Sequence, residues 1–341
     1  MGVSVLRRRA RRLDGDRRGG DRGLGRLCVA ARTDEEAGVR RRFSLVTAWL
    51  TTAVFLALIA PLFALPYPLA VRASGLAGRL LLPLSPAAGR VRDNLALLGR
   101  NGGPRAARRL TAQVGDSFGR VLAEYIRMGG FAARPGLLHV HGGDALRTAL
   151  KAGRGAIIVS AHFGNWEAIR LAGRGLGVEV GIIYRPFNNP AFNAVALGKI
   201  AMAGEPVLYK GAAGLKQMVR HLRGGGAILI LLDQRLGDGA ALPFMGRTAH
   251  TATSVAALAQ RMGAPLIPAV GQRRADGLSF DVTFEPPIIA DAPDAAMRAV
   301  NARFEAWIDR APGQWFWLHR RWKWAGDPVS GSSVTCSSAD T

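Results

Sequence analysis

Apolar strand-like runs alternate with amphipathic helical stretches along most of the chain, and this alternation constrains its fold most. The expected strands are residues 156–160, 178–184, 207–209, 227–232, 265–270 and 278–284, and the expected helices are 165–174, 190–202, 211–223, 251–262 and 294–310. Strands that alternate with helices are typical of a sheet covered by helices on both faces. The sequence therefore predicts an α/β fold with a central mixed, largely parallel sheet.

The N-terminal part has a different composition. Residues 1–42 are rich in Arg, Gly and Asp and lack apolar periodicity, which indicates a disordered basic leader; a transit peptide and a reading frame that starts too early are alternatives. No ionised side chain occurs from Ser44 to Val71, and about 20 apolar residues cross a hydrocarbon layer of roughly 30 Å.

We therefore expect a hydrophobic membrane-anchoring helix within residues 43–82, an α/β domain at 83–326 and a flexible tail at 327–341. Three prolines in the anchor are compatible with a re-entrant or interfacial second half. A buried hairpin of core helices is the alternative interpretation of the anchor.

The charge and the cysteine content limit the partners and the chemistry. Lys and Arg number 46 against 24 acidic residues, a net charge of +22, which favours an anionic membrane surface, an acidic protein or nucleic acid as partner. The two cysteines, Cys28 and Cys336, lie near the termini and cannot form a disulfide framework. No phosphate-binding glycine loop and no metal-ligand spacing occurs, so no metal or bound cofactor is expected.

Polar residues follow three of the expected strands. His162 comes two residues after the strand at 156–160, Asp233 directly follows 227–232, and Arg185 follows 178–184. Polar groups past the carboxyl ends of parallel strands form sites in α/β sheets. The three side chains are therefore expected at one edge of the sheet.

The stretch "HFGNWE" adds Glu167 five residues after His162. The two side chains can meet only if His162 lies in a loop and Glu167 in the first turn of the next helix, because five residues on one helix place them on different faces. Gly164 permits a close approach and Asn165 is a good N-cap. A carboxylate on one imidazole nitrogen raises the basicity of the other; the alternative is a structural histidine with Glu167 at the surface.

No G-x-S-x-G elbow and no core cysteine occurs, so a covalent acyl-enzyme has no evident nucleophile. A general base without its own nucleophile suits direct transfer between two bound substrates, one of them an alcohol.

From about residue 43 to 324 the chain resembles the lipid A biosynthesis acyltransferases, within the wider lysophospholipid acyltransferase group. The matching stretches are the apolar N-terminal segment, "NLALL", "HFGNWE", "YRPFNNP", "LLDQR", "PFMGRTAHTATSVAALAQRMGAPLIP" and "PGQWFWLHRRWK". The resemblance implies His162 as general base, Glu167 as its acidic partner and Asp233 as a further catalytic carboxylate. It also implies acyl carrier protein as acyl donor, a glycolipid hydroxyl as acceptor, and a place on the cytoplasmic side of the inner membrane.

The expected substrate-binding residues are less specific. Arg185 is the expected cation near the site, and Lys199 stands where relatives carry an arginine. A backbone donor near Gly164, with Asn165 beside it, could serve the oxyanion. Arg247 belongs to residues 243–254, which we expect to be a flexible loop and helix start lining the acyl or acceptor pocket.

The aromatic and basic stretch "QWFWLHRRWKW" favours an interfacial edge at lipid headgroup level, with some of its tryptophans in the core; stacking on nucleic acid is the alternative. Three alternatives stay open. The chain could be a phosphatidylinositol mannoside acyltransferase that uses acyl coenzyme A, a non-catalytic family member with a decayed site, or a basic membrane protein that binds nucleic acid. In the preferred interpretation nucleic acid is not a partner.

Overall fold

The computed structural model describes residues 45–54, 57, 60–61, 64–100 and 102–322. Two compact units are distinguished, Met1–Val54 and Phe55–Thr341. In the first unit, residues 45–54 are helical. Among all the described residues, no helix is both long enough and apolar enough to cross a membrane. The expected leader, the expected tail from residue 327 and residues 55–56, 58–59 and 62–63 of the expected anchor lie outside the described residues.

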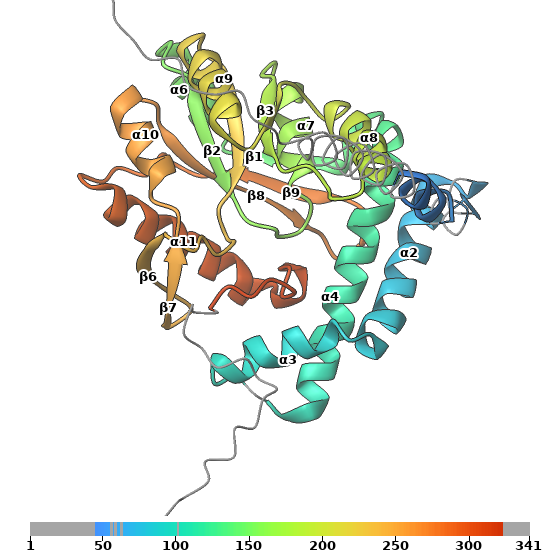
Figure 1. Cartoon of the computed structure of the whole chain (residues 1–341). Helices are drawn as coiled ribbons and strands as arrows, with labels where there is room; N and C mark the ends of the chain where they lie inside the picture. The colour runs from blue at the N-terminus through green and yellow to red at the C-terminus, as the bar shows by residue number, and fades with distance from the viewer. Residues whose placement is uncertain (1–44, 55–56, 58–59, 62–63, 101, 323–341) are drawn as a thin grey trace, which may run out of the picture. The chain divides into compact units, whose positions relative to one another are not determined.

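The second unit is built on a seven-stranded sheet in the order β1-β9-β8-β2-β5-β3-β4 (Figure 1). Its strands are β1 (Leu138–His141), β2 (Ala156–Ser160), β3 (Val180–Tyr184), β4 (Val207–Tyr209), β5 (Ala227–Leu231), β8 (Leu266–Arg273) and β9 (Phe280–Phe284). Strands β8, β2, β5, β3 and β4 run parallel to one another, whereas β9 is antiparallel to β8 and β1 is parallel to β9. The predicted mixed, largely parallel sheet is confirmed.

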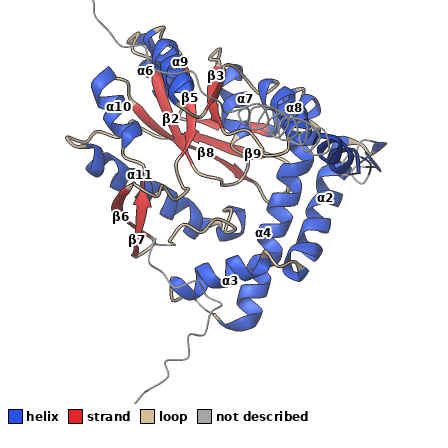
Figure 2. Ribbon diagram, viewed as in Figure 1, coloured by secondary structure: helices blue, strands red, loops and turns tan. Residues whose placement is uncertain are grey.

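Helices cover both faces of this sheet (Figure 2). They are α2 (Tyr67–Leu81), α3 (Ala88–Leu97), α4 (Gly103–Ile126), α5 (Met128–Ala132), α6 (Gly143–Lys151), α7 (Glu167–Gly175), α8 (Pro190–Ala201), α9 (Ala212–Arg223), α10 (Ser254–Met262) and α11 (Pro293–Arg310). Alternate residues of β2 point to opposite faces. Ile157 and Val159 pack in the core that includes α9, α10 and α11, and Ile158 packs in the core that includes α6 and α7.

Helix α2 lies inside the segment expected to be the membrane anchor, and it packs closely on α4. The Ser74 hydroxyl donates to the Gly119 carbonyl oxygen at 2.7 Å. A Cβ atom on Gly119 would lie 2.2 Å from the Ser74 carbonyl oxygen, and one on Gly115 would lie 2.1 Å from that of Gly78. The backbones approach this closely because glycines three and four residues apart share one helix face. Residues 67–81 are therefore part of the folded unit.

Of the flexible loop and helix start expected at residues 243–254, the helix start is confirmed, because α10 begins at Ser254, and the flexible loop is wrong. Residues 240–251 form an antiparallel hairpin of β6 (Ala240–Phe244) and β7 (Arg247–Thr251). Met245 and Gly246 make its turn with φ of 53° and 76°. Two positive φ values are typical of the tight turns that match strand twist, but Met245 is not one of the residues that signal such a turn in a sequence.

Candidate active site

His162 and Asp233 meet because their strands are neighbours in register. Ser160 of β2 is paired with Leu231 of β5, and Leu232 donates its N–H to the Ser160 carbonyl oxygen at 2.9 Å. Two residues further along each strand, His162 Nδ1 lies 2.7 Å from Asp233 Oδ1. The His162 backbone N–H donates to Asp233 Oδ2 at 2.9 Å. The loop after β2 is therefore held to the carboxylate by its backbone and by its imidazole.

Asp233 is fully buried, and a third donor, Trp315 Nε1, lies 2.8 Å from its Oδ2. Burial alone would raise the pKa of the Asp233 carboxyl, but the charge and hydrogen bond of His162, with His319 and Trp315, hold that pKa well below its usual range. Asp233 is therefore a carboxylate at neutral pH. Because an ionised carboxylate can only accept hydrogen bonds, the neutral His162 ring must carry its proton on Nδ1, the nitrogen that faces Asp233. Its other nitrogen, Nε2, therefore carries a lone pair.

The His162 ring is partly exposed and is held by its neighbours. The side chain is 17% exposed. The Trp166 and His319 rings contact the imidazole edge-on, with centroids 5.0 and 4.9 Å away. The amide nitrogen of Gln234 lies 3.4 Å from His162 Nε2. The ring is thus fixed by Asp233, Trp166 and His319, and an exposed residue, Gln234, is the neighbour of its basic nitrogen.

The expected direct contact between His162 and Glu167 is wrong. Glu167 is fully buried, and its two oxygens accept from Arg170 Nη1 and Tyr125 Oη, each at 2.6 Å. Arg170 also donates to the carbonyl oxygens of three residues outside the helix: Val180, Ile200 and Gly204. Glu167 is in the first helical turn, as expected, but its carboxylate points toward this buried arginine.

A chain of contacts nevertheless joins Glu167 to the imidazole. Tyr125 donates its hydroxyl proton to Glu167 and accepts from Trp166 Nε1 at 2.6 Å, and the Trp166 ring packs against His162. Burial and the Glu167 carboxylate raise the pKa of Tyr125, so the hydroxyl stays protonated. Glu167 thus fixes the wall of the site through two side chains.

Gly164 and Asn165 have structural contacts where the sequence suggested substrate contacts. The Gly164 N–H donates to the Gln314 carbonyl oxygen at 3.0 Å. Its φ is +54°, and a Cβ atom there would lie 2.0 Å from the Gly271 carbonyl oxygen. Buried Asn165 accepts from the Glu167 N–H at 2.9 Å and donates to Glu124 at 2.8 Å. Both residues shape the loop that carries His162.

The three expected cations are spread over different elements. Arg185 is exposed just after β3, Lys199 is half-buried in the last turn of α8, and Arg247 is exposed at the start of β7. Within the described part of the chain, none of the three forms a hydrogen bond or ion pair with His162 or Asp233. Their substrate-binding roles stay predictions.

The C-terminal segment contributes site residues that the sequence interpretation missed. Trp315, Trp317 and Trp322 are only 1–3% exposed, so the expectation that some tryptophans of this segment lie in the core is confirmed, and the interfacial placement is wrong for these three residues. The Phe316 N–H donates to the His162 carbonyl oxygen at 2.9 Å. Buried Asn94 of "NLALL" donates to the carbonyl oxygens of Trp317 and His319, which holds this segment against the site.

Arg321 ties the same segment to the hairpin. It is fully buried and donates to the His250 carbonyl oxygen at 2.5 Å and to Thr251 Oγ1 at 2.7 Å. Its guanidinium lies 5.1 Å from the centroid of the Phe244 ring. Burial lowers the pKa of Arg321 to about 10, and the side chain keeps its charge at neutral pH.

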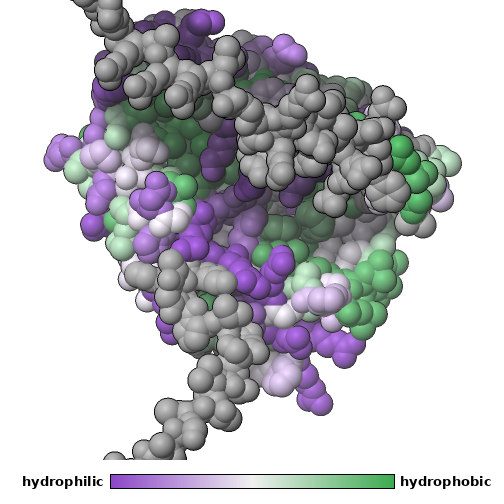
Figure 3. All heavy atoms as spheres, in the orientation of Figure 1, coloured by the Kyte–Doolittle hydropathy of each residue, from purple (hydrophilic) through white to green (hydrophobic). Residues whose placement is uncertain are grey.

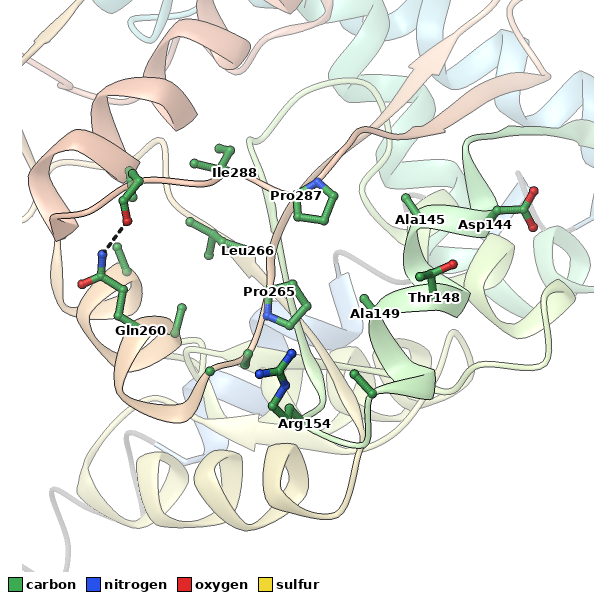
Figure 4. Close-up of a pocket in the computed structure, with 17 residues that line it drawn as sticks. Asp144, Ala145, Thr148, Ala149, Arg154, Gln260, Pro265, Leu266, Pro287 and Ile288 are labelled. Carbon is green, nitrogen blue, oxygen red and sulfur yellow. Dashed lines mark hydrogen bonds between the residues drawn. The ribbon is translucent and has the colours of Figure 1, made fainter.

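A cavity of about 640 Å³ lies away from this chemistry (Figure 4). It is lined by Arg154, which precedes β2, by Leu266 at the start of β8, and by small side chains of α6 and α10. These residues are at the amino ends of β2 and β8, whereas His162 follows the carboxyl end of β2. We place the candidate active site at the His162 edge, because there a buried carboxylate holds a partly exposed imidazole.

A largely parallel sheet with a buried Asp–His pair past the carboxyl ends of two neighbouring strands is an arrangement typical of α/β enzymes. The chain belongs to the bacterial lipid A biosynthesis acyltransferase family, which it matches over residues 37–324.

Three characterised relatives are similar to this chain. It is 30% identical over 192 residues to the lipid A biosynthesis lauroyltransferase of Escherichia coli (strain K12), covering 54% of this chain and 61% of the relative. It is 29% identical over 202 residues to the palmitoleoyltransferase of the same organism, covering 57% and 64%. It is also 29% identical over 257 residues to the phosphatidylinositol mannoside acyltransferase of Mycolicibacterium smegmatis, covering 65% and 81%. The matches span less than two thirds of the two Escherichia coli proteins.

Proposed function

We propose that this protein transfers a fatty acyl chain from an acyl thioester to a hydroxyl group of a lipid A precursor, by direct attack with His162 as general base. The observation that carries the proposal is the Asp233–His162 pair, in which a buried carboxylate holds the Nδ1–H of a partly exposed imidazole. In the described part of the chain, no serine, threonine or cysteine is hydrogen-bonded to His162. Direct transfer fits such a base better than a covalent intermediate.

The reaction is a nucleophilic substitution at the thioester carbonyl. His162 Nε2 takes the proton of the acceptor hydroxyl while its oxygen forms a bond to the carbonyl carbon. The tetrahedral intermediate collapses with cleavage of the C–S bond, and the imidazolium returns the proton to the leaving thiolate. The Asp233 carboxylate stabilises the imidazolium that exists between these steps. Glu167 acts as a positioning residue through Tyr125 and Trp166.

Acyl carrier protein is the proposed donor, because the net charge of +22 complements an acidic carrier. The match to the mycobacterial relative, which covers 81% of that protein, keeps a phosphatidylinositol mannoside as second candidate acceptor and acyl coenzyme A as second candidate donor. The names of the relatives support acyl transfer to a lipid, and the donor separates the two candidates.

The test is incubation of the detergent-purified protein with each thioester and each acceptor, with products read by mass spectrometry. We expect one added acyl chain on a tetra-acylated lipid A precursor, with the carrier-protein thioester preferred. Intact-protein mass spectra with donor alone should show no acyl adduct. Product only on the mannoside, or an acylated protein that accumulates before acceptor is added, would contradict the proposal.

The proposed location is the cytoplasmic side of the inner membrane, anchored by residues 43–66 and supported by α2. The outer side of α2 and the turn after it expose five leucines, each 50–75% exposed: Leu69, Leu76, Leu80, Leu81 and Leu84. Figure 3 shows hydrophobic residues gathered over this helix at the right. Leucines beside Arg72 and Arg79 suit the interface of an anionic bilayer.

Flotation with anionic vesicles tests this surface. Replacing both Leu76 and Leu80 by Glu should lower the bound fraction, because two charges then face the acyl region. Leu215→Glu on α9, where the leucine is also 50% exposed, is the matched control and should bind like the unchanged protein. Equal binding of all three proteins would contradict a role for α2.

A further inference from the structure

The four backbone N–H groups of the loop from His162 to Asn165 are already hydrogen-bonded. The N–H groups of residues 162–165 donate to Asp233 Oδ2 and to the carbonyl oxygens of Ala161, Gln314 and Gly271, respectively, at 2.7–3.1 Å. Each of these bonds also holds the loop to a neighbouring element or closes its turn. Opening one to bind an oxyanion would undo the placement of the imidazole. These four N–H groups therefore do not serve an oxyanion, and the side chains around the ring are the next candidates for the donor.

Gln234 provides a donor at the required place. It directly follows Asp233, and its Nε2 lies 3.4 Å from His162 Nε2 and 3.2 Å from His319 Nε2. The nitrogen end of the amide faces His162, because the Nε2 of that ring presents a lone pair once Asp233 holds the proton on Nδ1. The Gln234 amide has two N–H bonds, and the Nε2 atoms of His162 and His319 both lie within reach of its nitrogen. We therefore direct one N–H to each ring.

His319 is suited to hold this amide. Its ring lies edge-on to His162 with centroids 4.9 Å apart, and Asn94 fixes its backbone carbonyl oxygen at 2.9 Å. Burial, with a smaller effect of the charge on His162, lowers the pKa of His319 to about 4. His319 is therefore neutral at pH 7, and a neutral ring with its proton on Nδ1 accepts one N–H of Gln234 at Nε2.

We propose that the Gln234 side-chain amide is the oxyanion donor of the acyl-transfer step and that His319 positions it. The inference rests on the proposed function. When the acceptor hydroxyl occupies His162 Nε2, the N–H of Gln234 that faced this nitrogen is released toward the adjacent carbonyl oxygen. That oxygen becomes negative as the C–O bond forms, and the amide N–H stabilises it until the C–S bond breaks. A donor fixed in advance stabilises the transition state more than the ground state.

The test compares kcat and KM for Gln234→Ala, Gln234→Glu and the control Gln217→Ala, an exposed glutamine on α9. Removal of one oxyanion donor lowers kcat by roughly 10²–10³-fold in other enzymes, and we expect Gln234→Ala to do so with little change in KM. Gln234→Glu keeps the shape but presents acceptors, so it should be at least as slow. A kcat within about threefold of the unchanged enzyme for either variant would overturn the proposal.

His319 is tested by rescue. His319→Ala releases the amide and should lower kcat, whereas His319→Gln offers an oxygen acceptor to the same N–H and should restore most of the activity. Equal losses in both variants would limit His319 to a structural role and would overturn its part of the proposal.

Failure of the proposed function is distinguishable from failure of this inference. The proposed function is contradicted if the protein with its original sequence acylates no acceptor. Hydrolysis of a p-nitrophenyl acyl ester by the same protein then tests this inference, since its tetrahedral intermediate carries the same oxyanion. Gln234→Ala should slow that hydrolysis as it slows transfer. Hydrolysis that is unchanged in the variant, or not detectable in the unchanged protein, would count against the donor.

Discussion

Asp233→Asn replaces one carboxylate oxygen by an NH₂ group and reverses the proton arrangement of His162. Asp233 Oδ2 accepts from two donors, the His162 backbone N–H and Trp315 Nε1, whereas Oδ1 accepts only from the imidazole. An asparagine satisfies the two fixed donors by placing its oxygen at the Oδ2 position. Its NH₂ group then faces His162 Nδ1, which must become an acceptor. The imidazole proton moves to Nε2, and the base loses the lone pair it needs.

The expected loss follows from these contacts. A hydrogen bond to a charged group contributes about 1.5–3 kcal/mol, which at about 1.36 kcal/mol per tenfold corresponds to a roughly 10- to 150-fold slower step. The reversed tautomer removes the remaining base function, so the total loss should reach about 10²–10⁴-fold. Because both fixed donors keep an acceptor, the variant should still fold.

The assay is turnover with the acyl thioester and the lipid acceptor, with Asp291→Asn, an exposed aspartate, as control. Circular dichroism and a urea titration confirm that Asp233→Asn is folded. A folded Asp233→Asn protein with more than about a tenth of the original turnover would refute the assignment of Asp233 as the group that orients the base.

Two further predictions concern buried charges near the site. Glu167→Ala leaves the Arg170 guanidinium buried without its counter-ion, so the free energy of unfolding in urea should fall by about 3–5 kcal/mol. The control is Glu179→Ala, which breaks an exposed ion pair with Arg174 and should lower the free energy of unfolding by about 0–1 kcal/mol. Equal effects of the two substitutions would contradict the buried pairing. The pKa of His319 is about 4 in the folded protein against about 6.5 in an unfolded chain. The unfolded chain therefore binds more protons between these values, and stability should rise with pH across that window. His319→Gln should flatten this rise, and an unchanged slope would argue against the lowered pKa.

Local periodicity predicted the elements of the sheet well. Strands at 156–160 and 207–209 have the expected bounds, and the other predicted strands differ by one to three residues at an end. Apolar runs flanked by turn residues specify such strands directly. The hairpin at 240–251 was missed because its turn uses Met245, and nothing in a methionine signals a positive φ.

The partner of His162 depends on strand order, which one sequence does not specify. The nearby Glu167 and the distant Asp233 were both candidate carboxylates. Strand β5 is next to β2 although β3 and β4 come between them in the chain. This arrangement places Asp233 beside His162 and leaves Glu167 to the buried Arg170.

The tryptophans near the C-terminus show a similar limit. An aromatic and basic stretch is compatible with a membrane interface and with a protein core, and composition does not separate the two. Trp315 is buried, and its indole N–H donates a hydrogen bond to Asp233, a residue 82 positions earlier in the chain. Contacts of this separation become visible only in the folded chain.

Turnover of His162→Ala, beside the exposed-surface control His139→Ala, is the most direct test of histidine-assisted direct transfer. Both proteins are compared at saturating thioester and acceptor after circular dichroism has confirmed folding. We expect His162→Ala to lose about 10²–10⁴-fold in turnover, while His139→Ala keeps the original rate. A folded His162→Ala protein that transfers acyl chains at nearly the original rate would show that another group removes the hydroxyl proton.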